Sequence, residues 1–175
     1  VRYKSLGDSG INVSIICLGT MTYGEQNTEK EGHRQLDYAI AQGVNFIDSA
    51  ELYAIPPKIE TYGKTESIIG SWLSSRGRRN EIILASKIAG GGEWVKHIRG
   101  GKTRFTEDYI TQAVSASLKR LRTDYIDLYQ LHWPERNTNY FGELGYKAGE
   151  EEAFLTPITE TLCALKKQID AGKIR

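Results

Sequence analysis

The chain alternates short runs of apolar residues with longer segments that mix apolar and polar positions. Four apolar runs have the length and composition of β-strands, at residues 15–18, 44–47, 82–86 and 125–131. Their nearly continuous apolar character is typical of strands buried on both faces, as in parallel sheets. Ahead of them, residues 2–6 and 11–14 flank Gly7-Asp8-Ser9-Gly10, which predicts a β-hairpin with a glycine-rich turn.

The segments between these runs have the three- and four-residue spacing of amphipathic helices. The clearest helix opens at Thr106, and its apolar face consists of Ile110, Ala113, Val114, Leu118 and Leu121. Residues 28–31, Thr-Glu-Lys-Glu, have the form of a capping box and predict an earlier helix that ends at Gly43. Between these two, the spacing predicts a helix from about Thr65 to Ser75.

A last helix is predicted to use Thr156 as its N-cap and Pro157 as its first residue. Its predicted buried stripe consists of Ile158, Leu162, Leu165 and Ile169. The order of elements is then hairpin, followed by four strands that alternate with helices, which indicates βαβ units and a parallel sheet. Two architectures fit this α/β pattern. A doubly wound open sheet would be complete at this length, whereas a (β/α)₈ barrel typically needs about 250 residues.

Composition is that of an ordinary globular protein and predicts a single domain over residues 1–175, with 39% hydrophobic and 26% charged residues. A net charge of +1 gives no reason to expect a nucleic-acid or membrane partner. The basic cluster Arg76-Gly77-Arg78-Arg79 is interpreted as a solvated turn. No apolar run approaches the length of a membrane span, and no basic segment leading into an apolar one opens the sequence, so secretion is not expected.

Several kinds of chemistry lack their usual motifs. Cys17 and Cys163 form neither a disulfide framework nor a zinc spacing, so we expect no metal and a reducing cytoplasm. The sequence contains no serine nucleophile elbow and no H-E-x-x-H motif. Gly90-Gly91-Gly92 lacks the spacing of phosphate-binding loops and is interpreted as a flexible lid.

Polar side chains stand at or near the ends of three successive predicted strands. Asp48, Lys87 and His132 each follow an apolar run, and Tyr53 comes shortly after Asp48. Because the carboxyl ends of parallel strands meet at one edge of a sheet, we expect these four side chains to share a pocket. Carboxylates are plentiful elsewhere, but only Asp48 ends a strand beside neighbours that give it a task.

Together the four residues would form a general acid aimed at a carbonyl group. A phenol has an ordinary pKa of about 10 and donates protons poorly near neutrality, but an ammonium within about 4–6 Å stabilises the phenolate. Lys87 would supply that cation, Asp48 would hold it, and His132 would donate an N–H to the carbonyl oxygen. No side chain supplies a hydride, so a nicotinamide would be required. Each residue alone has an ordinary structural interpretation, and Tyr62 is a rival for Tyr53.

Seven segments, in order along the chain, resemble motifs of the aldo/keto reductase family. They are residues 18–21, 48–53, 63–70, 86–87, 117–121, 124–128 and 131–133. Residues 48–53, Asp-Ser-Ala-Glu-Leu-Tyr, are similar to its D-T/S-A-x-x-Y segment, and residues 63–70 are similar to its G-x-x-E-x-x-x-G helix. The insertion at 54–62, the Trp133-Pro134 pair and the loop at 137–152 most resemble the bacterial Tas-type branch of the family.

The resemblance implies the N-terminal half of a (β/α)₈ TIM barrel, with an N-terminal hairpin and about four βα units. It implies NADPH-dependent reduction of an aldehyde or ketone, with Tyr53 rather than Tyr62 as proton donor, Lys87 and Asp48 tuning it, and His132 orienting the carbonyl. The residues implied near the cofactor are Gly19, Thr20, Met21 and Asp48. Those implied to contact substrate are Tyr53, His132 and Trp133.

In the family, most contacts to the pyrophosphate and adenosine come from strands five to eight, which would follow Arg175. We therefore expect the chain to be part of a longer protein. The alternatives are self-association of two half-chains and an inactive truncated fragment. A second hypothesis for function is a non-catalytic NADPH-binding regulatory module, resembling the potassium-channel β subunits of the family.

Overall fold

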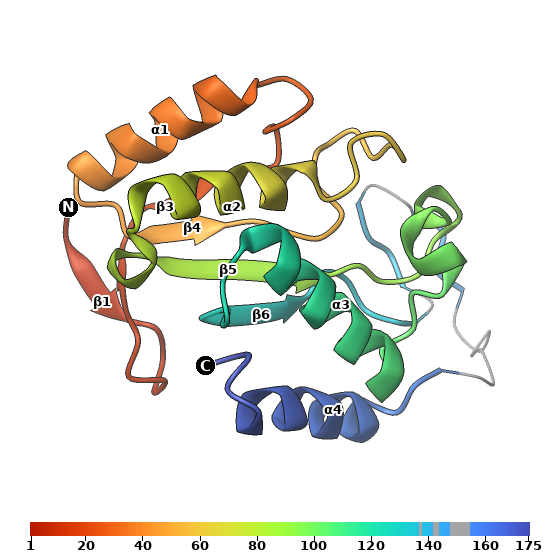
Figure 1. The fold of residues 1–175 in the computed structure, drawn as a ribbon. Helices are drawn as coiled ribbons and strands as arrows, with labels where there is room; N and C mark the ends of the chain where they lie inside the picture. The colour runs from red at the N-terminus through yellow and green to blue at the C-terminus, as the bar shows by residue number, and fades with distance from the viewer. Residues whose placement is uncertain (137, 142–143, 148–154) are drawn as a thin grey trace.

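The computed structural model describes residues 1–136, 138–141, 144–147 and 155–175. Its centre is a four-stranded parallel sheet in the order β3-β4-β5-β6, with the helices packed along it (Figure 1). The strands are β3 (Cys17–Gly19), β4 (Phe46–Asp48), β5 (Ile83–Ile88) and β6 (Leu128–Leu131). Each strand adds beside its predecessor, whereas a doubly wound sheet reverses its strand order at a switch point. The topology is therefore that of a partial (β/α)₈ barrel.

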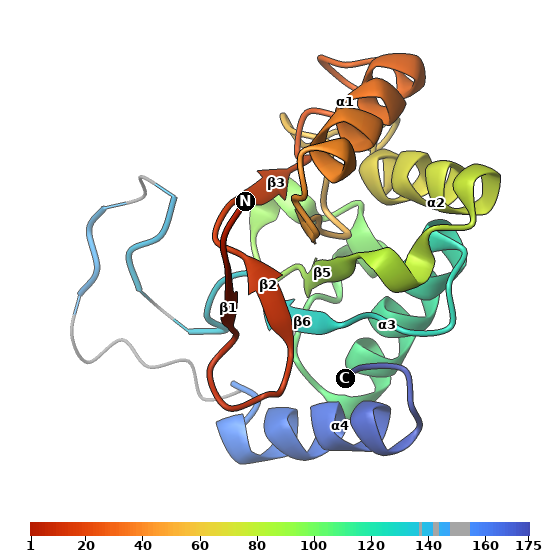
Figure 2. The ribbon, with the colours of Figure 1, turned by 90° about the vertical axis from the view of Figure 1, so that its left-hand side faces the viewer.

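An antiparallel hairpin lies at the amino end of the sheet, as Figure 2 shows. It consists of β1 (Tyr3–Ser5) and β2 (Asn12–Ser14), joined by a turn in which Gly7 and Gly10 adopt φ values of 56° and 73°. Positive φ costs glycine little, which explains the glycine-rich turn. Asn45 attaches the hairpin to the barrel strands, because its side chain accepts from the Ser14 N–H at 2.7 Å and donates to the Asn12 carbonyl at 3.1 Å. The predicted hairpin is confirmed.

The helices match the predicted periodicity at most positions. They are α1 (Glu29–Ala41), α2 (Lys64–Arg76), α3 (Glu107–Leu121) and α4 (Ile158–Asp170). The predicted capping box forms, since the Glu31 N–H donates to Thr28 Oγ1 at 3.3 Å and the Thr28 N–H donates to Glu31 Oε2 at 2.8 Å. None of the helices in the described ranges is both long and apolar enough to span a bilayer.

The core lies between the sheet and these helices. Alternate strand residues, among them Ile47, Leu84 and Ile88, point towards the helices and are fully buried. Helices α2 and α3 approach closely at Gly70, where an added Cβ would lie 2.1 Å from the Arg120 carbonyl oxygen. A side chain at that position would push the two helices apart, so glycine there has a packing reason.

The other face of the sheet has no covering helix in the part of the chain that the structure describes. Its residues, such as Phe46, Ile83 and Leu128, are only half-buried, and Cys17 is exposed. Ile15 and Ile16, which precede β3, are 48% and 55% exposed. The prediction of strands buried on both faces was therefore wrong for the described chain, because helices pack on one face alone.

Helix α4 departs from its prediction at its first turn. Pro157 is the N-cap rather than the first helical residue, and the helix begins at Ile158. The Thr156 side chain does not cap the helix. Its hydroxyl and its N–H both lie 3.0 Å from Glu135 Oε1, which ties the start of α4 to the segment after β6.

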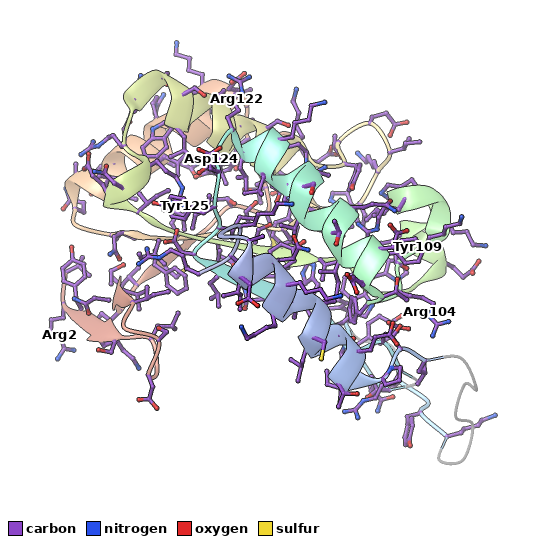
Figure 3. All side chains as sticks on the ribbon, turned by 60° about the horizontal axis from the view of Figure 1, so that its bottom comes forward. Arg2, Arg104, Tyr109, Arg122, Asp124 and Tyr125 are labelled. Atoms are coloured by element: carbon purple, nitrogen blue, oxygen red, sulfur yellow. The ribbon has the colours of Figure 1, made fainter. Side chains whose placement is uncertain are left out.

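The buried face of α4 was also predicted wrongly. Of the predicted stripe, Ile158, Leu162 and Ile169 are 60%, 56% and 43% exposed. The residues that face α3 are instead Thr161, Ala164 and Gln168. Figure 3 shows α3 and α4 side by side, and Gln168 Nε2 donates to Thr111 Oγ1 across that contact at 3.0 Å. Small and hydrogen-bonding side chains allow close helix packing here, and of the predicted stripe only Leu165 packs against the core, partly buried.

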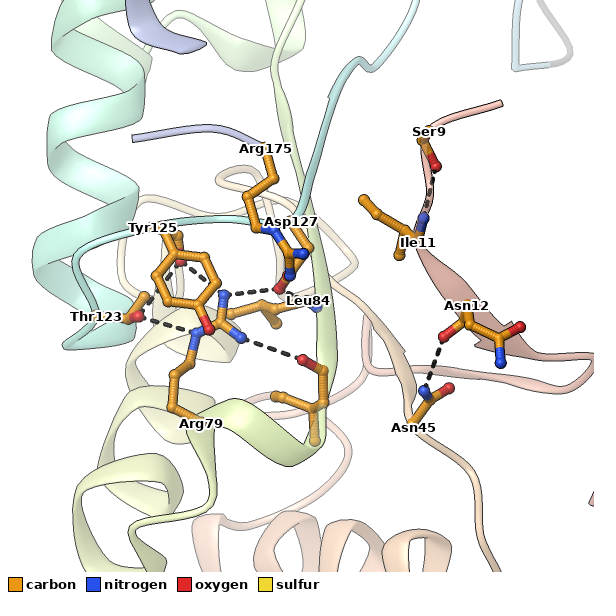
Figure 4. A network of polar contacts seen from close by, with 11 residues as sticks. Ser9, Ile11, Asn12, Asn45, Arg79, Leu84, Thr123, Tyr125, Asp127 and Arg175 are labelled. Carbon is orange, nitrogen blue, oxygen red and sulfur yellow. Dashed lines mark hydrogen bonds and ion pairs between the residues drawn. The ribbon is translucent and has the colours of Figure 1, made fainter. Parts of the chain in front are cut away.

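Asp127 lies at the amino end of β6, at the centre of a polar network (Figure 4). Its buried carboxylate accepts from Arg79 Nη2 at 2.7 Å, from the Leu84 N–H at 2.9 Å and from Arg175 Nη1 at 2.7 Å. Arg79 is thus a structural ion-pair partner. The cluster Arg76–Arg79 was interpreted as a solvated turn. That interpretation was wrong for Arg79, because its side chain is only 17% exposed.

After α4 the chain returns to the sheet beside β6. Ile174 forms a parallel bridge with Ile126, and the Ile126 N–H donates to the Lys173 carbonyl at 2.9 Å. The segment therefore occupies the position of a fifth parallel strand. This pairing continues the sheet in one direction, as a barrel requires.

Candidate active site

The four predicted residues converge at the carboxyl end of the sheet. Asp48 is the last residue of β4, Lys87 lies within β5, and His132 directly follows β6. Lys87 is opposite Gln130 in the strand register, and alternation places Asp48, Lys87 and Gln130 on the face away from the helices. Tyr53 reaches the same place from the loop between β4 and α2. The predicted convergence is present in the structure.

Lys87 is the charged centre of this group. Its Nζ donates to Asp48 Oδ2 at 2.6 Å and to the Ser49 carbonyl at 2.7 Å. The Tyr53 hydroxyl is 3.4 Å from Lys87 Nζ and 3.4 Å from His132 Nε2. The Lys87 side chain is only 12% exposed, so its charge acts on its neighbours with little screening by water. The phenol therefore lies between an ammonium held by a carboxylate and an imidazole.

His132 is neutral in this environment. Burial, and secondarily the positive charge of Lys87, lowers the pKa of His132 from 6.5 to about 4. Its ring meets the Tyr53 ring edge-on, with centroids 5.4 Å apart. Its Nδ1 is buried and has no hydrogen-bond partner among the described residues. A neutral imidazole can donate one N–H to a ligand oxygen without bringing a second full positive charge to the site.

Tyr62, the alternative proton donor, lies elsewhere. Its ring packs against His97 at 5.7 Å between centroids, and the Arg120 guanidinium lies 5.2 Å from its centre. Burial raises the pKa of the Tyr62 phenol. Its environment therefore does not favour proton donation, and Tyr53 is the tyrosine that lies beside Lys87.

A cavity of about 400 Å³ lies beside Tyr53 and His132. It is lined by Met21, Leu52, Tyr53, Ile55, Pro57, Trp94, His132, Tyr140 and Phe141. Apart from Tyr53 and His132, the lining is apolar or aromatic, and no charged side chain of the described residues belongs to it. A second cavity of about 850 Å³ shares Trp94 and Tyr140 with the first, so these two aromatic side chains separate the two spaces.

Trp133 lies behind this aromatic wall. It is 4% exposed and stacks on Trp94 at 5.0 Å and on Tyr140 at 6.1 Å between ring centroids. Its Nε1 donates to the Gly91 carbonyl at 2.9 Å. A Cβ at Gly90 would come within 2.5 Å of that indole nitrogen, so the glycine allows close packing. Trp133 does not line the cavity at Tyr53, and its contact with a substrate stays a prediction.

The residues expected near a nicotinamide differ in how accessible they are to a ligand. An added Cβ at Gly19 would meet nothing within 4 Å, so the sheet is open there, and Met21 is 48% exposed on the cavity wall. Thr20 is fully buried, and its hydroxyl donates to the Asp48 carbonyl at 2.7 Å. Gly19 and Met21 are therefore accessible to a ligand, whereas Thr20 holds β3 against β4, and contact of Gly19 or Met21 with a nicotinamide stays a prediction. The described residues contain no cluster of side chains suited to a metal ion.

Comparison with known proteins decides the family. Residues 15–175 match the sequence model described as "Aldo/keto reductase family". The chain belongs to the aldo/keto reductase family. The chain is 48% identical over 176 residues to Protein tas of Escherichia coli, and the match covers all of this chain and 50% of that protein. The aldo-keto reductase AKR11C1 from Bacillus halodurans, solved in its holo form, is similar with a TM-score of 0.73 and 33% identity.

That similarity covers 99% of this chain and 48% of the solved one, which confirms the partial barrel. A probable voltage-gated potassium channel subunit beta of Arabidopsis thaliana is 33% identical over 174 residues, covering 98% of this chain and 44% of that protein. The chain spans about half the length of the curated relatives that it matches.

Two fully buried carboxylates of this aldo/keto reductase chain were not predicted to have a role. Glu51 is fully buried and bonds to Arg99 and the Ala89 N–H, while Glu66 is fully buried and bonds to Arg120 and Ser86. Glu51 stands between the buried residues Ala50 and Leu52, so an isolated carboxylate inside an apolar stretch was the signal available in the sequence. Neither carboxylate ends a strand, so the pattern of polar residues at strand ends did not identify them.

Proposed function

We propose that the chain is the active-site part of an NADPH-dependent oxidoreductase that reduces an aldehyde or ketone to an alcohol, with Tyr53 as proton donor. The observation that carries the proposal is the place of the Tyr53 hydroxyl, 3.4 Å from both the Lys87 ammonium and the His132 imidazole. A proton donor in the wall of an apolar cavity matches the need of a carbonyl oxygen that gains negative charge.

Lys87 and Asp48 prepare Tyr53 to lose its proton. When the phenol donates to the developing alkoxide, negative charge appears on the Tyr53 oxygen, and the Lys87 ammonium beside it stabilises that charge. The Asp48 carboxylate, 2.6 Å from Lys87 Nζ, keeps the ammonium charged and in place. Because both groups are already oriented, little reorganisation is needed when the charge develops.

His132 orients the substrate. Its pKa of about 4 keeps the ring neutral at physiological pH, so it donates one N–H to the carbonyl oxygen and does not compete with Tyr53 as an acid. The apolar wall of Leu52, Ile55 and Trp94 excludes water from the reacting group.

NADPH supplies the hydride when it is bound. Gly19 and Met21 would lie against its nicotinamide ring, and Asp48 would lie near the same end of the cofactor. We infer that the other partner is a small uncharged carbonyl compound, because the described lining of the cavity carries no charged side chain. A cytoplasmic location, in which NADPH is available, fits this function.

The alternative function is an NADPH-binding regulatory module without turnover. One observation favours it, namely the 33% identity to the probable channel subunit beta of Arabidopsis thaliana. Both functions would use the same fold and cofactor, so the fold does not discriminate between them.

A two-part experiment tests the proposal. The 175-residue chain is titrated with NADPH while nicotinamide fluorescence is followed, and NADPH consumption is then measured with a panel of aldehydes and ketones. Saturable binding together with turnover that disappears in Tyr53→Phe is the expected result. Binding without turnover on any carbonyl would support the regulatory module. If a folded sample binds no NADPH, the chain requires self-association or further polypeptide, and the proposal fails for the chain alone.

A further inference from the structure

Glu51 lies between Asp48 and Tyr53 in the sequence, and the mechanism above gives it no role. Its side chain is completely buried. Its own N–H donates to the Lys87 carbonyl at 3.1 Å, which fixes its backbone relative to β5. Burial raises the pKa of the Glu51 carboxyl, and the positive charge of Arg99 acts in the opposite direction. Burying a carboxylate costs free energy unless it is paired and hydrogen-bonded, so the partners of Glu51 should explain why it is buried close to Tyr53.

The Glu51 carboxylate holds two points on one loop. Oε1 accepts from the Ala89 N–H at 2.6 Å, and Oε2 accepts from Arg99 Nη1 at 2.5 Å. Ala89 is the first residue after β5, and Arg99 adopts a left-handed conformation, with φ of 46°, further along the same loop. Arg99 is nearly buried and Glu51 is its salt-bridge partner within the described chain, so the two charges depend on each other.

The loop between these two points carries part of the cavity wall. Trp94 lies on it and lines the same cavity as Tyr53 and His132. Val95 and Ile98, which follow Trp94 in the loop, are fully buried in one cluster with Tyr53. One carboxylate, two residues before Tyr53, therefore anchors both ends of the segment that carries Trp94.

The chain offers a matched buried carboxylate without this connection. Glu66 is also completely buried, and it accepts from Arg120 Nε at 2.7 Å and from Ser86 Oγ at 2.5 Å. These contacts join α2, α3 and β5 on the side of the sheet that the helices cover. Within the described residues, the hydrogen bonds of Glu66 and Arg120 reach Ser86 and Ser117 and not the loop that carries Trp94, so this pair serves as a buried ion pair with a structural role alone.

We propose that Glu51 is a positioning residue, which through Ala89 and Arg99 fixes Trp94 relative to Tyr53 and so sets where a carbonyl compound lies against its proton donor. The identity of that compound rests on the proposed function. The placement of Trp94 does not, so it can be measured without cofactor or turnover.

The first test is Glu51→Gln, with Glu66→Gln as its matched control. Glutamine keeps the size and one oxygen for the Ala89 N–H but removes the charge that Arg99 requires. The stacked indoles of Trp94 and Trp133, 5.0 Å apart and inclined by 26°, couple their transitions and produce an exciton band in circular dichroism. Glu51→Gln is expected to lose this band and keep the helical signal, whereas Glu66→Gln keeps both.

Turnover gives the second readout. In a preparation that reduces a carbonyl compound, Glu51→Gln is expected to lower kcat about tenfold or more, because a small misplacement of the reacting groups is costly. Glu66→Gln is expected to keep the wild-type kcat and KM. If the wild-type protein shows no turnover, the proposed function fails, and the exciton band alone then decides the role of Glu51.

A double variant separates positioning from folding. Glu51→Gln combined with Arg99→Met removes both charges, so no unpaired charge remains buried and the fold is expected to recover. The exciton band and kcat are expected to remain reduced, because the ion pair that joins residue 51 to Arg99 is gone. Recovery of the wild-type band and kcat in the double variant would overturn the proposal, as would an exciton band in Glu51→Gln equal to that of Glu66→Gln.

Discussion

Charged side chains at the two ends of the central sheet differ in burial and in how completely they are hydrogen-bonded, although β5 and β6 contribute to both ends. At the amino end, the fully buried Asp127 carboxylate is satisfied by three donors within 2.7–2.9 Å, and both of its oxygens are used. At the carboxyl end, Lys87 and Asp48 are 12% and 27% exposed, and among the described residues the Tyr53 hydroxyl has two hydrogen-bond partners, both at 3.4 Å.

This difference indicates that Asp127 stabilises the fold, whereas Tyr53 and His132 can still bind a ligand. A buried charge with every hydrogen bond made contributes to a unique structure, and its removal leaves its partners uncompensated. The hydrogen bonds to the Tyr53 hydroxyl are long, and the buried Nδ1 of His132 has no partner in the part of the chain that the structure describes, so both side chains can still hydrogen-bond to a ligand. In barrel enzymes the carboxyl end of the strands is the catalytic end, and the amino end serves stability.

The largest expected effect is on activity at the carboxyl end. Tyr53→Phe removes the proposed proton donor and is expected to lower the rate of carbonyl reduction about a thousandfold. The free energy of unfolding is expected to change little, because the lost contacts are long. Steady-state kinetics and urea denaturation of the same preparation measure the two quantities. Retention of activity within tenfold of wild type would remove Tyr53 from the mechanism.

The largest expected effect on stability is at the amino end. Asp127→Asn leaves the buried Arg79 guanidinium without a counter-charge, and the free energy of unfolding is expected to fall by about 3 kcal/mol. Asp124→Asn, a nearby exposed position, is the control and should change it by less than about 0.5 kcal/mol. Urea denaturation measures both. Equal effects of the two substitutions would mean that the network does not stabilise the fold.

The next prediction concerns the pH dependence of stability that His132, at the carboxyl end, is expected to cause. The folded pKa of His132, about 4, lies below its ordinary value of 6.5, so between these pH values the unfolded chain binds more protons than the folded one. Stability is therefore expected to fall as the pH decreases through this window, by up to about 1.4 kcal/mol per pH unit. His132→Gln should lose that share of the pH dependence in urea titrations. Parallel curves for wild type and variant would contradict the buried, neutral ring.

The smallest expected effect also comes from the amino end. Arg175 donates to Asp127 at 2.7 Å, but its side chain is 52% exposed and screened by water. Arg175→Ala is expected to lower the free energy of unfolding by less than about 1 kcal/mol. Arg79→Ala, at the buried side of the same carboxylate, should cost clearly more in the same assay. A larger loss for Arg175→Ala would show that exposure is a poor guide in this network.

Much of the catalytic end could be predicted from sequence because its signals are local. Asp48, Lys87 and His132 each stand at the end of an apolar run, and parallel strands bring such ends together. The helical period of α3 likewise predicted its buried residues Ile110, Val114 and Leu121. In these places hydrophobic spacing and chain connectivity were sufficient.

The rest depends on contacts between distant positions, for which no local pattern exists. Arg79 and Asp127 are 48 residues apart, as are Glu51 and Arg99, and no motif contains both members of either pair. In α4 the apolar stripe was visible, but the choice of face depends on α3. Side chains that fit its surface, such as Ala164, decided the packing.

The close approach of Gly90 to Trp133 also restricts how the sequence can vary. Because a Cβ at position 90 would come within 2.5 Å of the indole nitrogen, the two positions are not independent. A side chain at 90 becomes acceptable only after residue 133 has become smaller, and a smaller residue at 133 removes the stacking partner of Trp94. This epistasis limits the order in which substitutions can accumulate. A library that varies the two positions one at a time would miss the combinations that fold.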